Sequence, residues 1–352
     1  MAKVGIIGTG WGARTQTPAF RMAGLTVVGI AGRDPERTRR LGGQLGVEPF
    51  DDWRDLVARP DVDLITIVTP PAEHLEMALA ALEAGKHVLS EKPTALNAEE
   101  AAKMAEAARA RPGQLALIDH ELRFLPSWRA ARERRDEIGK VCYAEVRYAS
   151  PGRADPSRPW NWWSDATQGG GVWGAAGSHF VDALRYLVGE ILEVQAVLRT
   201  FIAERPSDGG RKVVTSDDFA AVHARLPAGA LAVLVFSVVA GLDEETMLTF
   251  HGEKGAIRLT GENFLMSKTG GGWSMEHQGT PLDVPGNTAG GAFGSGTVHL
   301  GRALAALLDG GDREPLSPAA TFQDGLAQQR VLDAGRRSHE NGGRWEKVQR
   351  VR

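Results

Sequence analysis

The first third of the chain alternates short runs of β-branched residues with segments of helical periodicity. Residues 72–84 and 98–109 predict helices, and the second begins after Asn97 with Glu100 three residues on, a capping-box arrangement. Strands that are separated by helices run parallel with right-handed crossovers. Residues 1–122 are therefore predicted to form a doubly wound α/β domain around a parallel sheet. The predicted strands lie at residues 4–7, 27–30, 64–68, 87–89 and 115–118.

The rest of the chain follows a different pattern, in which strands succeed one another with short turns between them. Residues 123–352 are therefore predicted to form an α+β domain with a large, open, mostly antiparallel sheet. The apolar run at 230–240 predicts a buried strand. Cys142 is expected in the core of its own strand. Residues 286–296 are predicted to form a glycine-rich loop. The predicted strands are 141–148, 194–201, 219–226, 231–239, 247–251 and 256–259, the helices 126–138, 173–188, 297–308 and 319–340, and the hairpin loops 227–229 and 252–255.

Length and charge restrict the partners of this chain. At 352 residues it is longer than one hydrophobic core usually organises, which predicts two domains. The formal net charge is −3 with no basic block, so neither nucleic acid nor a membrane is expected as a partner. The single cysteine excludes an internal disulfide framework and, with no secretory pattern in the first residues, favours the cytoplasm. The histidines show no ligand-like spacing with carboxylates, so a small molecule and no metal is expected.

A glycine-rich turn follows the first predicted strand and precedes a helix. Gly8 would permit the tight reversal, Gly10 would let the backbone approach a diphosphate, and the small Ala13 would let the helix pack on the strand. The helix N-terminus adds N–H donors and the positive end of its dipole. The turn therefore predicts a Rossmann domain that binds a dinucleotide, with an ordinary glycine-rich turn as the alternative. Its residues are Gly8, Thr9, Gly10, Trp11, Gly12 and Ala13.

The end of the second predicted strand bears on which dinucleotide binds. An acidic residue there would accept the ribose hydroxyls, whereas a cation would suit a 2′-phosphate. Arg33 stands at this position with Arg37 one helical turn further on, so NADP(H) is favoured over NAD(H). Asp34 is either a displaced ribose acid or the N-cap of the helix that starts at Pro35.

Lys92 follows the strand at 87–89, at the carboxyl edge of the sheet, where open α/β folds bind their ligands. Pro93 holds Lys92 extended, so its ammonium can be directed at a ligand and exchange a proton with a hydroxyl or carbonyl oxygen. A lysine on a surface loop is the alternative for these residues taken alone.

The motifs together resemble the Gfo/Idh/MocA oxidoreductases over essentially the whole chain. The resemblance implies a Rossmann domain followed by an open mixed sheet, with Lys92 as the catalytic lysine and a commonly cis bond to Pro93. It also implies that the turn at Gly8 and the loop at Thr69 and Pro70 line the cofactor. The residues that carry it are GTGWGA at 8–13, Thr69-Pro70-Pro71 followed by His74, Glu91-Lys92-Pro93, Arg123-Phe124, and Gly169-Gly170-Gly171 leading to Gly177-Ser178-His179.

The same resemblance assigns further site residues and shows one departure. Glu91, Arg123 and His179 would face the nicotinamide and the substrate, with His74 among the cofactor residues and His120 among the substrate residues. Members of the family usually carry an aspartate four residues before the histidine, on the same helix face. Here that position is Ala175, so Lys92 and His179 either suffice or are joined by another carboxylate. The candidate carboxylates are Asp119, Glu121, Asp165 and Asp182.

A loop before the three glycines carries Trp160, Trp162 and Trp163. Indole faces stack on the C–H faces of sugar rings, which predicts a sugar or polyol site. The alternative is that these tryptophans anchor the loop or a subunit contact. Arg153 and Arg158 would suit an acidic sugar, although surface arginines are common.

The sequence thus predicts an NAD(P)-dependent oxidoreductase that transfers a hydride between the nicotinamide and a sugar, polyol or related hydroxy or keto compound. Lys92, helped by His179, would move the proton. The second sheet is suited to face another subunit, which predicts a homodimer or homotetramer. The alternatives are a glycosidase that oxidises its substrate transiently without net redox change, and a non-catalytic protein that binds or senses the cofactor.

Overall fold

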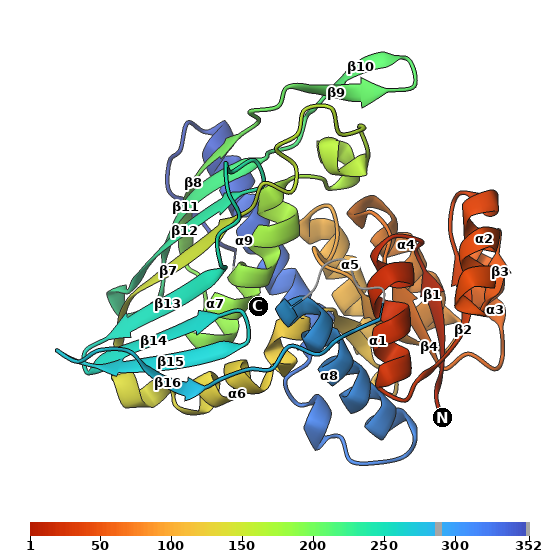
Figure 1. Ribbon diagram of the computed structural model, residues 1–352, viewed down its shortest axis with the longest axis horizontal. Coiled ribbons are helices and arrows are strands. Elements are labelled where there is room, and N and C mark those ends of the chain that lie inside the picture. The colour runs from red at the N-terminus through yellow and green to blue at the C-terminus, as the bar shows by residue number, and fades with distance from the viewer. Residues whose placement is uncertain (286–290, 350–352) are drawn as a thin grey trace. The chain divides into compact units, whose positions relative to one another are not determined.

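The computed structural model describes residues 1–285 and 291–349, and the chain forms two compact units (Figure 1). The first unit comprises Met1–Ala95, Glu99–Leu125 and Pro281–Leu326, and the second comprises Leu96–Ala98, Pro126–Thr280 and Ala327–Arg352. The predicted division after residue 122 lies close to the break at Leu125. The segment Pro281–Leu326, which that division assigned to the second domain, groups with the first unit by its contacts.

The first unit is built on a seven-stranded sheet in the order β17-β6-β5-β4-β1-β2-β3. Its neighbouring strands run parallel except for β17, which pairs antiparallel with β6. This is the predicted Rossmann sheet, and β4 is buried along its whole length because helices cover both faces of such a sheet. The strands are β1 (Lys3–Ile7), β2 (Thr26–Ala31), β3 (Glu48–Phe50), β4 (Leu64–Ile67), β5 (His87–Ser90), β6 (Ala116–Ile118) and β17 (Ala320–Thr321).

The helices of this unit begin with local signals that the sequence carries. Asp34 caps α2 by accepting a hydrogen bond from the Arg37 backbone N–H at 3.0 Å, and Gly46 ends that helix at a φ of 62°. α8 packs against the turn η3, where a Cβ on Gly296 would lie 2.7 Å from the Glu121 carbonyl oxygen. The elements are η1 (Gly12–Gln16), α1 (Thr17–Met22), α2 (Pro35–Leu45), α3 (Trp53–Ala58), η2 (Pro71–Glu73), α4 (His74–Glu83), α5 (Ala98–Arg109), η3 (Glu121–Phe124), α8 (Gly291–Leu308) and η9 (Glu314–Leu316).

The second unit is built on a nine-stranded sheet in the order β16-β15-β14-β13-β7-β12-β11-β8-β18. It is mostly antiparallel, as predicted, with β7 and β12 as the parallel pair. A separate hairpin of β9 and β10 extends beyond the sheet (Figure 1). The strands are β7 (Val141–Ala149), β8 (Glu193–Arg199), β9 (Glu204–Ser207), β10 (Gly210–Val213), β11 (Phe219–Arg225), β12 (Leu231–Ser237), β13 (Met247–Gly252), β14 (Gly255–Thr260), β15 (Asn263–Lys268), β16 (Ser274–His277) and β18 (Glu346–Lys347).

One face of this sheet is covered by helices (Figure 1). Trp173 and Phe180 pack on Phe236 of β12, with ring centroids 6.0 and 5.9 Å apart. The opposite face carries exposed apolar side chains, because the strands alternate between buried and accessible positions. The other elements are α6 (Pro126–Glu133), η4 (Arg135–Ile138), η5 (Trp162–Ser164), η6 (Ala166–Gln168), η7 (Trp173–Gly177), α7 (Ser178–Leu187), η8 (Pro227–Gly229) and α9 (Phe322–Glu340), the last with residues 327–340 in this unit.

Several local predictions need correction. Cys142 is exposed, because it lies at the start of β7 where a bulge shifts the pairing with β13. The predicted helix at 173–188 begins as a π-helical turn, η7, before α7. Of the predicted loop at 286–296, residues 286–290 lie outside the described residues, and Gly291 already begins α8. Within 1–285 and 291–349 we find no helix both long and apolar enough to cross a membrane.

Candidate active site

The glycine turn at the end of β1 leaves space beside one of its glycines. Gly8 adopts a φ of 138°, and a Cβ there would lie 2.3 Å from the Val68 carbonyl oxygen. A Cβ on Gly12 would lie 2.7 Å from Ile6, so this glycine packs tightly on its own strand. At Gly10, by contrast, a Cβ would meet no atom within 4 Å. The turn is therefore closed toward the strand and open at Gly10, which fits the approach of a diphosphate to the backbone.

The helix after this turn starts with a π-helical turn, η1, that the sequence pattern did not reveal. The Thr17 N–H donates to the Gly12 carbonyl, and the Thr17 hydroxyl donates to the same oxygen at 2.9 Å. This widened turn carries Gln16 into a fully buried position. Single π-helical turns occur often at functional sites. Ala13, three residues before Gln16, packs into the hydrophobic core as predicted from its size.

The predicted cofactor residues after β2 are held by two different partners. Arg37 donates to the Thr9 carbonyl at 3.1 Å and so ties α2 to the glycine turn. Arg33 is largely exposed and forms an ion pair with Glu73 at 3.4 Å. Burial raises the pKa of Glu73, while the charge of Arg33 opposes that rise. Glu73 was not among the predicted site residues, since a glutamate in a short helical turn carries no motif.

The loop after β4 is fixed by a buried histidine. One ring nitrogen of His74 lies 2.9 Å from the Thr69 carbonyl oxygen, and the other lies 3.1 Å from that of Pro93. His74 is completely buried, and burial lowers its pKa, while the hydrogen bonds to the carbonyl oxygens oppose that lowering. It therefore joins the Thr69–Pro70 loop to the segment that follows Lys92. The structure gives His74 a positioning role between two loops that resemblance assigns to the site.

Lys92 lies two residues after the end of β5 and is half-buried, and its peptide bond to Pro93 is cis, as the family resemblance implies. The backbone before it is set by the sheet, because the Glu91 N–H donates to the Ile67 carbonyl at 2.8 Å. The Lys92 N–H donates to a carboxylate oxygen of Glu91 at 3.3 Å. The segment thus presents Lys92 from the carboxyl edge of the parallel sheet.

Three buried carboxyl groups, those of Glu91, Asp119 and Glu121, surround this position and are called the carboxyl cluster below. Gln16 connects two of them, since its Nε2 donates to Asp119 at 2.8 Å and lies 3.3 Å from a Glu91 oxygen. The Asp119 N–H donates to the Ser90 carbonyl at 2.8 Å, which fixes the end of β6 beside that of β5. Asp119 and Glu121 were candidates from the sequence, whereas Gln16 was missed.

Burial dominates the electrostatics of the carboxyl cluster. It raises the pKa of Glu91 and raises the pKa of Asp119 and of Glu121 well above the usual range. The carboxyls also repel one another's ionisation, which adds to the rise for Asp119 and Glu121. The charge of Lys92 opposes the rise for all of them. The cluster therefore holds protons that a solvent-exposed group of carboxylates would have lost.

Two further predicted residues lie in the same region of the first unit. Arg123 is buried, donates to the Pro318 carbonyl at 3.2 Å and lies 3.7 Å from the Asp324 carboxylate. These contacts hold the turn η3 against the segment that leads into β17. His120 is also buried, directly before that turn. Both of these contacts of Arg123 are thus with groups of its own unit.

His179 belongs to the second unit, in the first turn of α7, and is buried. Ala175 lies in the π-helical turn η7 that precedes it. Because a π-turn contains more residues than an α-turn, a residue four positions before His179 is displaced from the face that a regular helix would give it. Asp165, another candidate carboxylate, accepts hydrogen bonds from the Thr167 N–H and hydroxyl and so caps its own turn.

The ring faces of the predicted tryptophans contact side chains of their own loop and of the β9–β10 hairpin. The ammonium of Lys212 lies 3.4 Å from the centre of the Trp160 ring, and the guanidinium of Arg153 lies 4.9 Å from that of Trp163. Trp160 also donates from Nε1 to the Val213 carbonyl at 3.1 Å. Trp162 and Trp163 contact each other at a centroid distance of 5.9 Å. These contacts favour the interpretation that Trp160 and Trp163 anchor the loop, each through one face of its ring.

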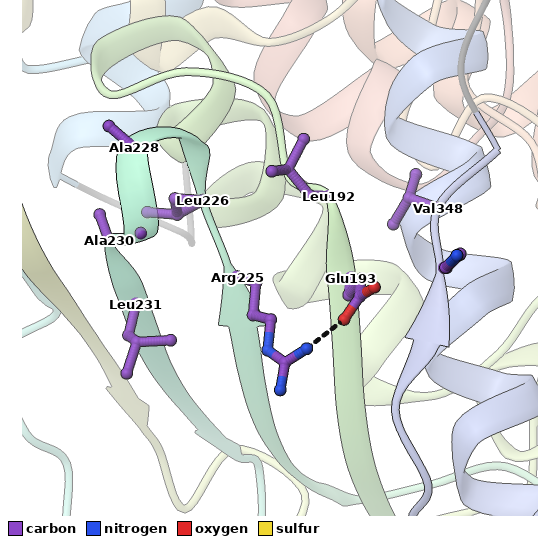
Figure 2. Close-up of a pocket in the computed structure, with 10 residues that line it drawn as sticks. Leu192, Glu193, Arg225, Leu226, Ala228, Ala230, Leu231 and Val348 are labelled. Atoms are coloured by element: carbon purple, nitrogen blue, oxygen red, sulfur yellow. Dashed lines mark hydrogen bonds and ion pairs between the residues drawn. The ribbon is translucent and has the colours of Figure 1, made fainter.

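A pocket of about 550 Å³ opens at one end of the nine-stranded sheet (Figure 2). Its lining is mainly apolar and includes Leu192, Leu226 and Val348. Arg225 points toward Glu193 in the pocket and forms an ion pair with it at 2.6 Å. None of the predicted site residues is among those that line it, so this pocket is separate from the groups described above.

The glycine turn, the parallel sheet and the lysine at its carboxyl edge define a nicotinamide-binding oxidoreductase of the Rossmann type. Residues 2–118 match the family model for the oxidoreductase family with an NAD-binding Rossmann fold, and residues 128–258 match the GFO/IDH/MocA C-terminal domain. The chain belongs to the Gfo/Idh/MocA family of oxidoreductases.

Known relatives are similar over most of the chain. Human glucose-fructose oxidoreductase domain-containing protein 2 is 30% identical over 370 residues, covering 98% of this chain and 93% of that protein. Levoglucosan dehydrogenase in complex with NADH and levoglucosan superposes with a TM-score of 0.86 at 26% identity, covering 99% of this chain and 100% of that chain. An oxidoreductase domain protein from Kribbella flavida superposes with a TM-score of 0.85 at 31% identity, covering 99% of each chain.

Proposed function

We propose that this protein is an NAD(P)-dependent dehydrogenase or reductase that acts on a CH–OH carbon of a sugar, polyol or related compound. The observation that carries the proposal is the segment Glu91-Lys92-Pro93, fixed at the carboxyl edge of the Rossmann sheet beside the carboxyl cluster. A structural neighbour, levoglucosan dehydrogenase, binds NADH and a sugar, which supports the substrate class. The finer choice of substrate follows from the experiments below.

Different segments of the first unit would bind different parts of the cofactor. The backbone around Gly10 would hold the diphosphate, with the first N–H groups of the following helix as donors. The loop at Thr69 and Pro70, which His74 fixes, would line the nicotinamide half. When bound, the nicotinamide supplies or accepts the hydride. The protein itself must therefore provide the proton transfer.

Lys92 would exchange that proton with the oxygen of the substrate. Its ammonium donates to a carbonyl oxygen in reduction, and its amine accepts from a hydroxyl in oxidation. His179 is the second proton-transfer residue in this proposal, on the strength of the family resemblance. Asp119 and Glu91 would serve as the carboxyl groups with which Lys92 shares its proton, since Gln16 holds them together beside it. In this proposal they take the place of the acidic residue that is absent at Ala175.

For the cofactor, NADP(H) remains the proposed choice over NAD(H), because Arg33 offers a guanidinium to a 2′-phosphate. Glu73 opposes this preference, since a 2′-phosphate must replace it as the partner of Arg33. The levoglucosan dehydrogenase neighbour binds NADH. Dissociation constants of the wild type for NADPH and NADH test the choice, and equal affinities would remove the NADP(H) proposal.

Turnover of a panel of sugars and polyols tests the reaction class. Net formation of NADH or NADPH with a neutral or acidic sugar, abolished in Lys92→Met, is the expected result. Release of an aglycone with no net change in the cofactor would instead identify the redox-neutral glycosidase. Tight cofactor binding without turnover of any compound in the panel would identify a cofactor-binding or sensing protein.

The exposed face of the nine-stranded sheet is the proposed contact between subunits. It carries Tyr143, Val197, Leu231 and Val233, each more than two-fifths exposed, on neighbouring strands. Exposed apolar side chains on a sheet face suit the interface of a symmetric homodimer or homotetramer. Val233→Glu should shift the protein to monomers in sedimentation, whereas Val213→Glu on the β9–β10 hairpin should not. A wild-type monomer at high concentration would refute this contact.

The cytoplasm is the proposed location. Cys142 is a free and exposed thiol, a state that reducing compartments maintain. Cell fractionation with a tagged chain tests this, and recovery from an oxidising compartment would contradict it.

A further inference from the structure

Arg153, Arg158 and Arg205 gather in the second unit and are called the arginine cluster below. The first two lie in the loop before η5, and Arg205 lies on β9 of the hairpin. Arg205 is 2% exposed and donates to the Arg153 carbonyl at 2.6 Å and to the Asp155 carbonyl at 2.8 Å. Arg158 donates to the Gly152 carbonyl. The loop and the hairpin are thus joined by guanidinium groups.

The guanidinium of Arg153 lies between polar and aromatic groups. It is 4.9 Å from the centre of the Trp163 ring and donates to the Asn161 side-chain oxygen at 3.2 Å. Asn161 in turn accepts from the Trp163 N–H at 3.1 Å, so ring and amide hold the arginine in one orientation. An arginine oriented in this way presents its remaining N–H groups as a fork suited to two oxygen atoms.

No member of the arginine cluster has a carboxylate within ion-pair distance among residues 1–285 and 291–349. Arg211, on the same hairpin, shows the usual arrangement, with Glu204 at 3.2 Å. Burial, together with the charges of Arg205 and Arg158, lowers the pKa of Arg153 to about 10. A guanidinium does not lose its proton at neutral pH, so this cluster remains positive. The cost of gathering these charges is offset when an anion binds.

The acidic side chains nearby are already engaged elsewhere. Asp155 accepts from the Ser157 N–H and hydroxyl. Asp218 accepts from the Phe201 and Ile202 N–H groups. Lys212 adds another positive charge over the Trp160 ring. The aspartates therefore form no ion pair with the arginine cluster, and the lysine adds to its positive charge.

We propose that Arg153 and Arg158, supported by Arg205, bind the carboxylate or phosphate group of an anionic sugar. The planar guanidiniums match the two oxygens of either group, and the tryptophans beside them offer apolar surface to the sugar ring. That this anionic sugar is the substrate of the enzyme rests on the proposed function. The anion site itself stands on the contacts of the second unit alone.

Calorimetric titration of the full chain without cofactor tests the site. The probes are D-glucuronate, glucose 6-phosphate and D-glucose, which separate a carboxylate, a phosphate and a neutral ring. At least one anionic probe should bind tenfold or more tightly than glucose, in line with the strength of charged hydrogen bonds. Arg153→Gln and Arg158→Gln should each reduce that preference at least fivefold. Arg211→Gln removes the same charge from a paired arginine and should leave the preference unchanged.

Equal binding of all three probes by the folded wild type would overturn the proposal. An equal loss in Arg211→Gln and Arg153→Gln would also overturn it, because that result indicates a general effect of surface charge. Thermal melts of each variant show that it is folded, and Arg158→Gln provides the test if Arg153→Gln is not. Turnover measured separately distinguishes the two proposals: anion preference without turnover retains the site and rejects the proposed reaction.

Discussion

The carboxyl cluster of the first unit and the arginine cluster of the second gather charge of one sign each, but they differ in how that charge is relieved. Glu91, Asp119 and Glu121 are buried together, and their raised pKa values allow them to hold protons. Arg153 and its neighbours cannot give up theirs at neutral pH. Buried carboxyl groups can lose their charge by taking up protons. Arginines keep their charge at neutral pH, so only a bound anion can balance it.

This difference also separates the proposed roles. A carboxyl cluster that takes up and releases protons beside Lys92 is suited to proton transfer. An arginine cluster whose charge is permanent is suited to binding and orientation.

Replacing Lys92 by methionine should have the largest effect. It removes the proton donor and the positive charge that favours ionisation of all three carboxyls, so kcat should fall about 10³-fold. The dissociation constant for the cofactor should change less than threefold, since the glycine turn is untouched. Steady-state kinetics and cofactor titration measure the two quantities. Turnover within tenfold of the wild type would reject Lys92 as the proton-transfer residue.

Replacing His179 by alanine tests the second unit in the same way. We expect kcat to fall about 10²-fold with little change in cofactor affinity. His339→Ala, on α9 of the same unit, is the control for loss of a histidine and should retain the wild-type rate. If the two variants turn over equally fast, His179 has no part in the reaction.

Replacing Asp119 by asparagine should alter the pH dependence of both stability and rate. The folded-state pKa of Asp119 is raised well above 3.8, so the folded protein keeps a proton that the unfolded chain loses as pH rises. The free energy of unfolding therefore falls with rising pH from about 4 until the folded-state pKa is passed, by up to about 1.4 kcal/mol per pH unit. Asp119→Asn removes this contribution, and kcat should fall about tenfold.

Urea denaturation at several pH values measures the slope, and Asp61→Asn provides a control of opposite sign. Hydrogen bonds from Arg59 and Lys3 lower the pKa of Asp61, so its contribution to stability is lost as pH falls. Asp61→Asn should therefore flatten the acid limb and leave the slope in the neutral region unchanged. An Asp119→Asn variant with the wild-type slope would show that the carboxyl cluster holds no proton on this residue.

Replacing Glu73 by glutamine should have the smallest effect. Glu73 is a single carboxylate paired with a single arginine, an arrangement intermediate between the two clusters. Freeing Arg33 should tighten NADPH binding about threefold, the size expected for an exposed ion pair, and leave NADH binding unchanged. Arg33→Ala is the matched variant and should weaken NADPH alone. Parallel changes for both cofactors in either variant would exclude discrimination by this pair.

The parts of the fold that local patterns predict were confirmed by the structure. The alternation of apolar runs and helical segments predicted the parallel sheet, and strand succession predicted the second, mostly antiparallel sheet. Short elements such as β3 and the β9–β10 hairpin were missed. A strand of three or four residues, or one made mostly of polar residues, shows little alternation of apolar and polar positions. The π-helical turns were also missed, since the residues of GARTQ and WGAAG suit an α-helix equally well.

The candidate site likewise contains residues that local motifs predict and residues that only the packing of distant segments brings together. Gly8, Gly10 and Lys92 stand in contiguous motifs, so the sequence by itself determined the turn, the lysine and their place at the ends of strands. Only the tertiary structure decided that Gln16 joins Asp119, 103 positions away, and that Arg205 holds a loop about fifty residues before it. The physical reason is that local motifs reflect backbone geometry, whereas buried hydrogen bonds and gathered charges depend on which distant segments pack together.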